Sequence, residues 1–132
     1  MRSIIFTVGL PGSGKTTLAK ALSNMFGYFH FEYDLYVMDK NHYKNTHEND
    51  KIIIDAWYRN GSDLLQGLTQ AKEEFNYENI TVIYLKTPKE KCINRIKTRN
   101  RSTVDITNET SNYNFDEISK YINFDLIVIE DF

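Results

Sequence analysis

The sequence predicts a single α/β domain over residues 1–132, in which a mostly parallel five-stranded sheet lies between two layers of helices. Short apolar runs rich in β-branched residues alternate with amphipathic segments along the chain. A glycine-rich turn joins the first apolar run directly to the first amphipathic segment, as expected for a strand followed by a crossover helix. The length allows one domain with a proper core, and no repeat or linker divides the chain.

Five apolar runs are the expected strands, because each is short and bounded by polar residues, glycine or proline. They cover Ile4–Val8, Tyr28–Tyr33, Ile52–Ile54, Ile80–Leu85 and Leu126–Ile129. Strands that alternate with helices pair in parallel through right-handed crossovers, so their carboxyl ends meet at one edge of the sheet. Ligands of such sheets bind at that edge.

Four segments are the expected helices. The first carries apolar residues at helical spacing from Leu18 to Met25 and stops at Gly27. The other three begin at turn or capping signals, which are Asn60–Ser62, Thr87–Glu90 and Asn114–Glu117. The last of these helices is expected to continue to Tyr121. Together with the strands, these helices complete a β-α alternation.

The turn after the first strand reads Gly9-Leu10-Pro11-Gly12-Ser13-Gly14-Lys15-Thr16 and fits G-x-x-x-x-G-K-[ST] at every fixed position. Glycines let backbone N–H groups wrap a phosphate chain, and the start of the next helix adds free N–H groups and its dipole. Lys15 is expected to reach the outer phosphates and the Thr16 hydroxyl to bind Mg²⁺. The residues expected at the nucleotide are Gly9, Pro11, Gly12, Ser13, Gly14, Lys15, Thr16 and Thr17. The alternative is a Gly/Pro turn without a ligand.

Two aspartates follow predicted strands and should share the sheet edge with the phosphate loop. Asp55 ends the third strand, where a carboxylate would hold Mg²⁺ through water or orient the acceptor; the alternative is a cap. Asp34 ends the second strand and could accept the proton of an attacking hydroxyl; its alternative is the cap of the next helix. Glu32 lies on the same side of that strand as Asp34 and is the reserve candidate for the base.

The net charge of −2 does not by itself indicate a nucleic-acid partner, but the charges are unevenly distributed. Seven basic residues and one acid lie between Lys86 and Arg101, which favours an anionic ligand on one face. Arg95 and Arg99 are four residues apart and share a helical face. At least one of them is expected at the charge of a transferred phosphoryl group. The alternative is a solvated helical face.

The rest of the composition excludes several classes of protein. The single cysteine, Cys92, excludes an intrachain disulfide, suits a reducing compartment and is expected to pack in a helix. The histidines lack a metal-ligand spacing and are expected to be structural or surface residues; they are His30, His42 and His47. No apolar run approaches the ~20 residues that span a bilayer, and we expect no signal peptide before the first strand. We therefore expect a cytoplasmic protein without membrane contact.

These motifs resemble those of the P-loop kinases, and most closely the kinase domain of phage-type polynucleotide 5′-hydroxyl kinases. The similarity is carried by Met1–Ala19, by Asp34 after the second strand, by Ile52–Asp55, and by Thr87–Arg99, which resembles a P-loop kinase lid helix. The resemblance implies ATP as the donor, with Lys15 and Thr16 at its phosphates and metal. It further implies Asp34 as the base, Arg99 as the transition-state clamp, and the phosphate-loop strand in the middle of the sheet.

The chain departs from that family at three places, one of which is the short segment between Asp34 and Asp55, where the family normally binds the acceptor. The family's arginine three residues after the catalytic aspartate, which holds the acceptor phosphate, is Val37 here. In addition, we expect no final helix after the last strand, although that region helps hold the donor base in related kinases. The donor base pocket is therefore expected to be open, or to be completed by a second subunit of a homo-oligomer.

The expected activity is Mg²⁺-dependent transfer of the γ-phosphoryl group of ATP to a hydroxyl acceptor, with a nucleic-acid 5′-end as the first candidate. A nucleoside or nucleotide kinase is the alternative among enzymes, and it would show little dependence on strand length. From a different class, a non-catalytic nucleotide-binding regulatory module would turn over ATP equally with or without an acceptor.

Overall fold

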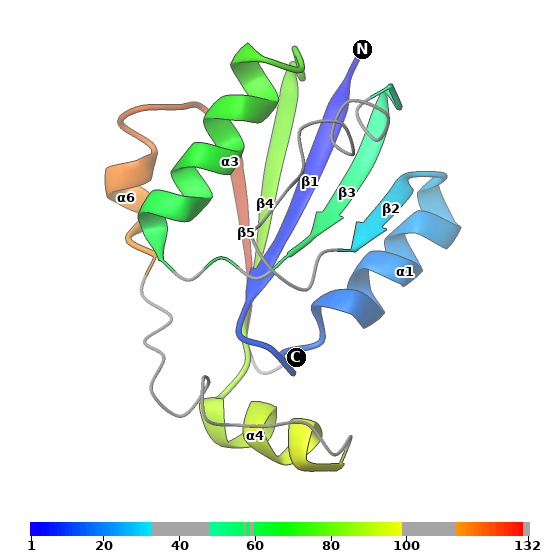
Figure 1. Ribbon diagram of the computed structural model, residues 1–132, viewed down its shortest axis with the longest axis vertical. Coiled ribbons are helices and arrows are strands. Elements are labelled where there is room, and N and C mark those ends of the chain that lie inside the picture. Colours follow the sequence, from blue (N-terminus) through cyan, green and yellow to red (C-terminus); the bar gives the residue numbers. More distant parts are fainter. Residues whose placement is uncertain (33–47, 57, 59, 99–112, 131–132) are drawn as a thin grey trace.

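A five-stranded parallel sheet with helices on both faces forms the fold (Figure 1). The computed structural model describes residues 1–32, 48–56, 58, 60–98 and 113–130. Its strands are β1 (Ser3–Gly9), β2 (Phe29–Glu32), β3 (Lys51–Asp55), β4 (Asn79–Lys86) and β5 (Asp125–Glu130). They follow the order β2-β3-β1-β4-β5, and each neighbouring pair is parallel. The predicted fold class and the central place of the phosphate-loop strand are both confirmed.

The helices begin where the sequence signals place them. They are α1 (Lys15–Phe26), α3 (Gly61–Glu73), α4 (Lys89–Thr98) and α6 (Phe115–Ile118). The Asn60 side chain accepts a hydrogen bond from the Asp63 N–H over 2.9 Å at the start of α3, and Gly27 ends α1 in the left-handed conformation. Helix α6 is shorter than predicted, because the N–H of Tyr121 bonds the Ile118 carbonyl three residues back and makes a turn.

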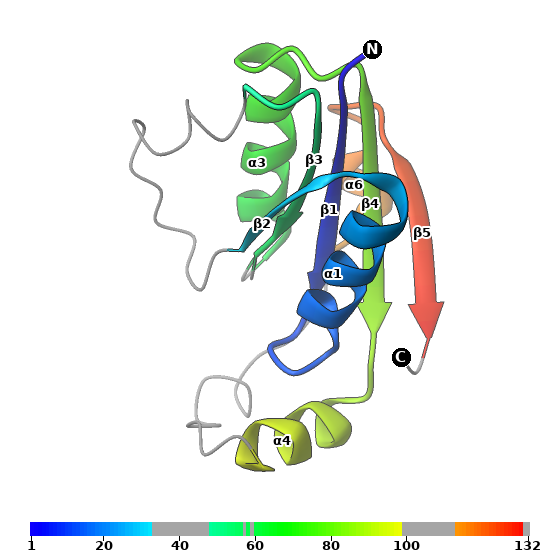
Figure 2. The same ribbon diagram turned by 90° about the vertical axis from the view of Figure 1, so that its right-hand side faces the viewer.

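Helix α1 covers one face of the sheet against β1, β2 and β3, while α3 and α6 cover the other face (Figure 2). The large apolar core lies on the α3 side, where Leu64 and Leu68 pack on the inward residues of the strands. The side of α1 that is buried presents the small residue Ala19 to the sheet. Among the described helices, none combines the length and hydropathy needed to cross a membrane.

Helix α4 lies beyond the carboxyl edge of the sheet, next to the turn between β1 and α1 (Figure 1). A second apolar cluster joins the two, formed by Leu10 of the turn with Cys92 and Ile96 of α4. Cys92 is fully buried, and burial raises the pKa of its thiol. A thiol in that environment is a packing residue rather than a nucleophile, so the expected role of Cys92 is confirmed.

Candidate active site

The turn between β1 and α1 folds back on itself at the carboxyl edge of the sheet. The Ser13 N–H donates to the Leu10 carbonyl over 3.0 Å and closes the turn. Gly12 and Gly14 have φ angles of 82° and 102°, in the left-handed region that favours glycine. A Cβ on Gly12 would also lie 2.6 Å from the Cys92 carbonyl oxygen. Gly12 and Gly14 are therefore required for the shape of this loop.

The structure brings the sequence-predicted phosphate-binding residues together in this loop and the first turn of α1. They are Gly9, Pro11, Gly12, Ser13, Gly14, Lys15, Thr16 and Thr17. A Cβ on Gly9, the last residue of β1, would lie 2.7 Å from Ser13 Oγ and 2.8 Å from the Leu85 carbonyl oxygen. Backbone N–H groups at the start of a helix lack intrahelical partners, and such groups are suited to binding an anion.

Lys15 is buried against the loop that it is expected to serve. Its Nζ donates to the carbonyl oxygens of Gly9 over 3.1 Å and Leu10 over 3.2 Å. Burial lowers the pKa of Lys15 from its ordinary value of 10.5 to about 8, although the negative charge of Asp55 acts in the opposite direction. The ammonium group is therefore present at neutral pH and held by neutral oxygens, which a phosphate oxygen could replace.

The lowered pKa of Lys15 predicts a pH-dependent affinity for nucleotide. Only the ammonium form attracts phosphate, so above pH 8 the free protein must take up a proton to bind ADP. The dissociation constant of ADP is expected to rise by up to about tenfold per pH unit above pH 8. Calorimetry between pH 7 and 9.5 without added metal would measure it. A Lys15→Met control should bind more weakly and show no such slope, and a flat wild-type profile would contradict the prediction.

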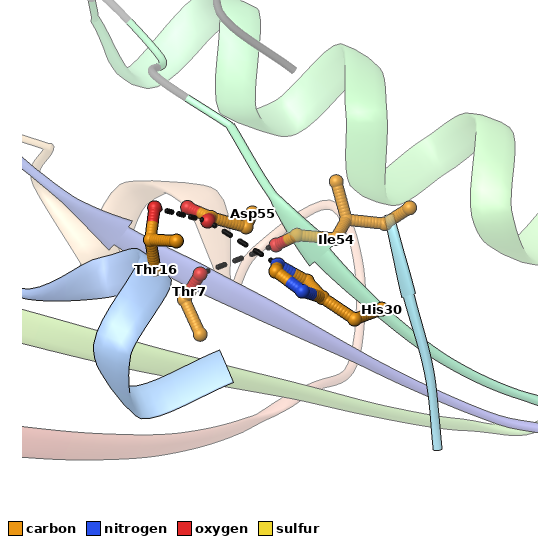
Figure 3. A network of polar contacts seen from close by, with 5 residues as sticks. All are labelled: Thr7, Thr16, His30, Ile54 and Asp55. Atoms are coloured by element: carbon orange, nitrogen blue, oxygen red, sulfur yellow. Dashed lines mark hydrogen bonds and ion pairs between the residues drawn. The ribbon is translucent and has the colours of Figure 1, made fainter. Parts of the chain in front are cut away.

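Asp55 lies at the end of β3, buried beside the start of α1 (Figure 3). Thr16 Oγ1 donates to Asp55 Oδ2 over 2.6 Å, and His30 Nε2 of β2 lies 3.4 Å from the same oxygen. On β1, Thr7 Oγ1 donates to the neighbouring Ile54 carbonyl over 3.4 Å. The two residues predicted to hold the metal, Thr16 and Asp55, are therefore in direct contact, although neither lies near the other in sequence.

This hydroxyl–carboxylate pair fits Mg²⁺, a hard cation that prefers oxygen ligands and keeps several waters. In the part of the chain that the structure describes, no group of three or more His, Cys, Asp or Glu side chains could hold a metal ion. Thr16 and Asp55 therefore suit a cation that takes its other ligands from water and phosphate, rather than a metal centre made wholly of protein side chains.

Two side chains from the β4–α4 region contact the backbone of the loop. Arg95 Nη1 donates to the Gly12 carbonyl over 3.1 Å, and Thr87 Oγ1 donates to the Ser13 carbonyl over 2.8 Å. Arg95 is thus placed next to the loop, where its guanidinium group donates to the loop backbone. The sequence pattern had indicated Thr87 only as part of a helix start.

Several sequence-predicted residues lie outside the described residues, namely Asp34, Val37 and Arg99. Glu32, the reserve base, ends β2 and pairs with Asp55 in the strand register. His30, which is expected to be a structural or surface residue, has its Nε2 3.4 Å from Asp55 Oδ2. Side chains alternate along a strand, so His30 lies on the same side of β2 as Glu32, and this signal would have pointed to it.

A family model described as an AAA domain matches residues 5–118. The chain belongs to this family. The match begins within β1 and ends with α6, so the AAA-domain region includes the phosphate loop, the strand that ends at Asp55, and α4. Every residue named above for the candidate site therefore lies inside the family match.

Among curated proteins, the shikimate kinase 2 of Syntrophotalea carbinolica is 28% identical to this AAA-domain chain over 115 residues. The match covers 74% of this chain and 65% of that protein, so the chain spans just under two thirds of its curated relative. This chain therefore has a phosphate loop, the sheet order described above and sequence similarity to a protein named as a kinase.

Solved structures share the fold at low sequence identity. Deoxyadenosine kinase from M. mycoides with bound dATP has a TM-score of 0.62 and 20% identity, over 97% of this chain and 91% of that one. A sugar kinase from a Janibacter species has a TM-score of 0.59 and 14% identity, over 98% and 86%. The AAA-domain chain therefore has the P-loop kinase fold. The narrower resemblance to phage-type polynucleotide kinases gains no support from these comparisons.

Proposed function

We propose that this chain is a Mg²⁺-dependent kinase that transfers the γ-phosphoryl group of ATP to a hydroxyl or phosphate group of a nucleoside or nucleotide. The observation that carries the proposal is the arrangement of Lys15, Thr16 and Asp55. A buried ammonium group held by loop carbonyls lies in the same turn as a hydroxyl bonded to a buried carboxylate over 2.6 Å. This arrangement supports binding of a phosphate chain and a divalent cation at one place, which phosphoryl transfer requires.

Each residue has a part in the proposed reaction. Thr16 and Asp55 would hold Mg²⁺, which would neutralise charge on the phosphates. Asp34 takes the proton of the acceptor hydroxyl while the oxygen of that hydroxyl attacks the γ-phosphorus. The bond between the γ-phosphorus and the bridging oxygen of the β-phosphate breaks, and ADP leaves. The guanidinium groups of Arg95 and Arg99 stabilise the negative charge that spreads over the transferred phosphoryl group.

A small acceptor is favoured over a nucleic-acid 5′-end. The proteins that support this choice are named as kinases of deoxyadenosine, shikimate and sugar. The position at which the phage-type family has its acceptor-phosphate arginine is Val37 here. We therefore place a nucleoside or nucleotide first, and keep the 5′-end as the competing acceptor.

An acceptor panel tests the proposal. The purified chain is incubated with Mg²⁺, labelled ATP or GTP, and separately with nucleosides, nucleoside monophosphates, shikimate, sugars and 5′-hydroxyl oligonucleotides of increasing length. Label on a nucleoside or nucleotide is the expected result. Label only on oligonucleotides would restore the 5′-end activity as the better description. ATP turnover that is equal with and without any acceptor would identify a regulatory module and overturn the kinase.

A further inference from the structure

We propose that Thr87 is a positioning residue that orients one backbone N–H of the phosphate loop toward the donor phosphates. Thr87 lies between the end of β4 and the start of α4, and it is buried. Its hydroxyl donates to the Ser13 carbonyl over 2.8 Å, across 74 positions of sequence. This inference rests on the proposed phosphate-binding role of the loop.

The geometry of the peptide bond gives this contact its effect. The Ser13 carbonyl and the Gly14 N–H belong to the same peptide group, and in a planar trans peptide they point in opposite directions. A donor that holds the carbonyl toward Thr87 therefore holds the Gly14 N–H toward the opposite side. Gly14 is the N-cap residue of α1, where N–H groups lack intrahelical partners and bind anions.

Ser13 depends on backbone contacts for its orientation. Its own Oγ is buried and has no hydrogen-bond partner among the described residues. Its N–H is bonded to Leu10 within the loop, so that bond moves with the loop and does not fix it to the rest of the fold. The hydroxyl of Thr87 supplies a contact from outside the loop to this residue.

The packing of α4 makes the contact rigid. The Gly12 backbone lies so close to α4 that an added Cβ would be 2.6 Å from the Cys92 carbonyl oxygen, and Arg95 bonds the Gly12 carbonyl. Leu10, Cys92 and Ile96 form a buried cluster between the loop and the helix. These contacts hold the loop against α4 independently of Thr87. Loss of the Thr87 hydroxyl would therefore free the Ser13–Gly14 peptide group and leave the rest of the loop in place.

A pair of variants separates the hydroxyl from the shape of the side chain. Thr87→Val keeps the shape and removes the donor, whereas Thr87→Ser keeps the donor. The dissociation constant of ADP, measured by calorimetry, is expected to rise about tenfold or more in Thr87→Val and to stay within about threefold of wild type in Thr87→Ser. Ser23→Ala is the matched control, because it removes a hydroxyl that donates to the Tyr28 carbonyl at the far end of α1. It should leave ADP affinity unchanged.

A spectroscopic readout tests the orientation itself. The chain has six glycines, so selective ¹⁵N-glycine labelling gives a spectrum in which Gly14 can be assigned. Inorganic pyrophosphate should shift the Gly14 N–H signal in wild type and in Thr87→Ser, but much less in Thr87→Val. If Thr87→Val does not fold, Thr87→Ala takes its place. Equal ADP affinity and an equal Gly14 shift without the hydroxyl would overturn the inference, whereas a wild-type chain that binds neither ADP nor pyrophosphate would overturn the proposed function.

Discussion

Replacing Lys15 with alanine is expected to abolish phosphoryl transfer while the chain stays folded. The Lys15 ammonium lies within 3.2 Å of two loop carbonyl oxygens, at the place where the proposed donor phosphates bind. Its charge would act on negative charge that develops in the transition state, in a buried site where such interactions are strong. Its loss should lower kcat by at least ~10²–10³-fold.

The fold should survive this change, because burial disfavours the charge in the folded state. The pKa of Lys15 is lowered to about 8, so the buried ammonium costs stability below pH 8, and this cost is removed as the pH rises from about 8 to 10.5. Alanine removes that cost in stability and also removes two hydrogen bonds, and these two effects on stability oppose each other.

Thermal unfolding would measure the stability of Lys15→Ala, and single-turnover transfer would measure its activity. The exposed Lys20 of α1 provides a control in Lys20→Ala, and Lys15→Ala activity within threefold of wild type would refute the assignment.

Replacing Asp34 with asparagine is expected to lower kcat by ~10²–10⁴-fold without a change in ATP affinity. The strand order supports separate roles for the two aspartates. Strand β3 lies beside β1, and its Asp55 contacts Thr16. Strand β2 lies one place further from the loop, and Asp34 follows its last residue, Glu32, by two positions. We therefore expect Asp55→Asn to raise the Mg²⁺ concentration needed for the half-maximal rate instead.

Steady-state kinetics with a Mg²⁺ titration would separate the two variants. Asparagine is itself a good helix cap, so an Asp34 that only caps a helix would tolerate the change with full activity. That outcome would pass the role of base to Glu32 or Asp55. Asp50→Asn is the matched control, because Asp50 is exposed and lies next to the opposite end of β3. Its kinetics and Mg²⁺ dependence should equal those of wild type.

The fold was largely predictable because its signals are local. Each of the five strands follows from a short apolar run, and Asn60 and Gly27 mark helix boundaries through their own side chain or backbone conformation. The length of α6 was not predictable in this way. Asn114 caps it as expected, but its turns change to shorter hydrogen bonds before Tyr121.

The site was predictable only where one segment contains it. The loop and the hydroxyl of Thr16 belong to a single pattern, and Asp55 could be inferred from the end of a strand. The contacts of Asp55 with His30 and of Ser13 with Thr87 join residues 25 and 74 positions apart. They depend on strand order and on the docking of α4, which no local spacing records. The sequence pattern did not indicate the contact of His30 with Asp55 or that of Thr87 with Ser13, because both join residues that are distant in sequence.

The strand order also has a consequence for how the chain acquires its structure. Strand β1 is synthesised first, but its two neighbours are β3 and β4, which end at Asp55 and Lys86. The apolar central strand therefore has no partner until β3 has been made, and it lacks its second partner until about two thirds of the chain has been made. Sheets built only from such distant pairings have high contact order, fold slowly and expose strand edges to aggregation. We expect the yield of native protein to depend on slow synthesis or chaperones more than on the stability of the finished fold.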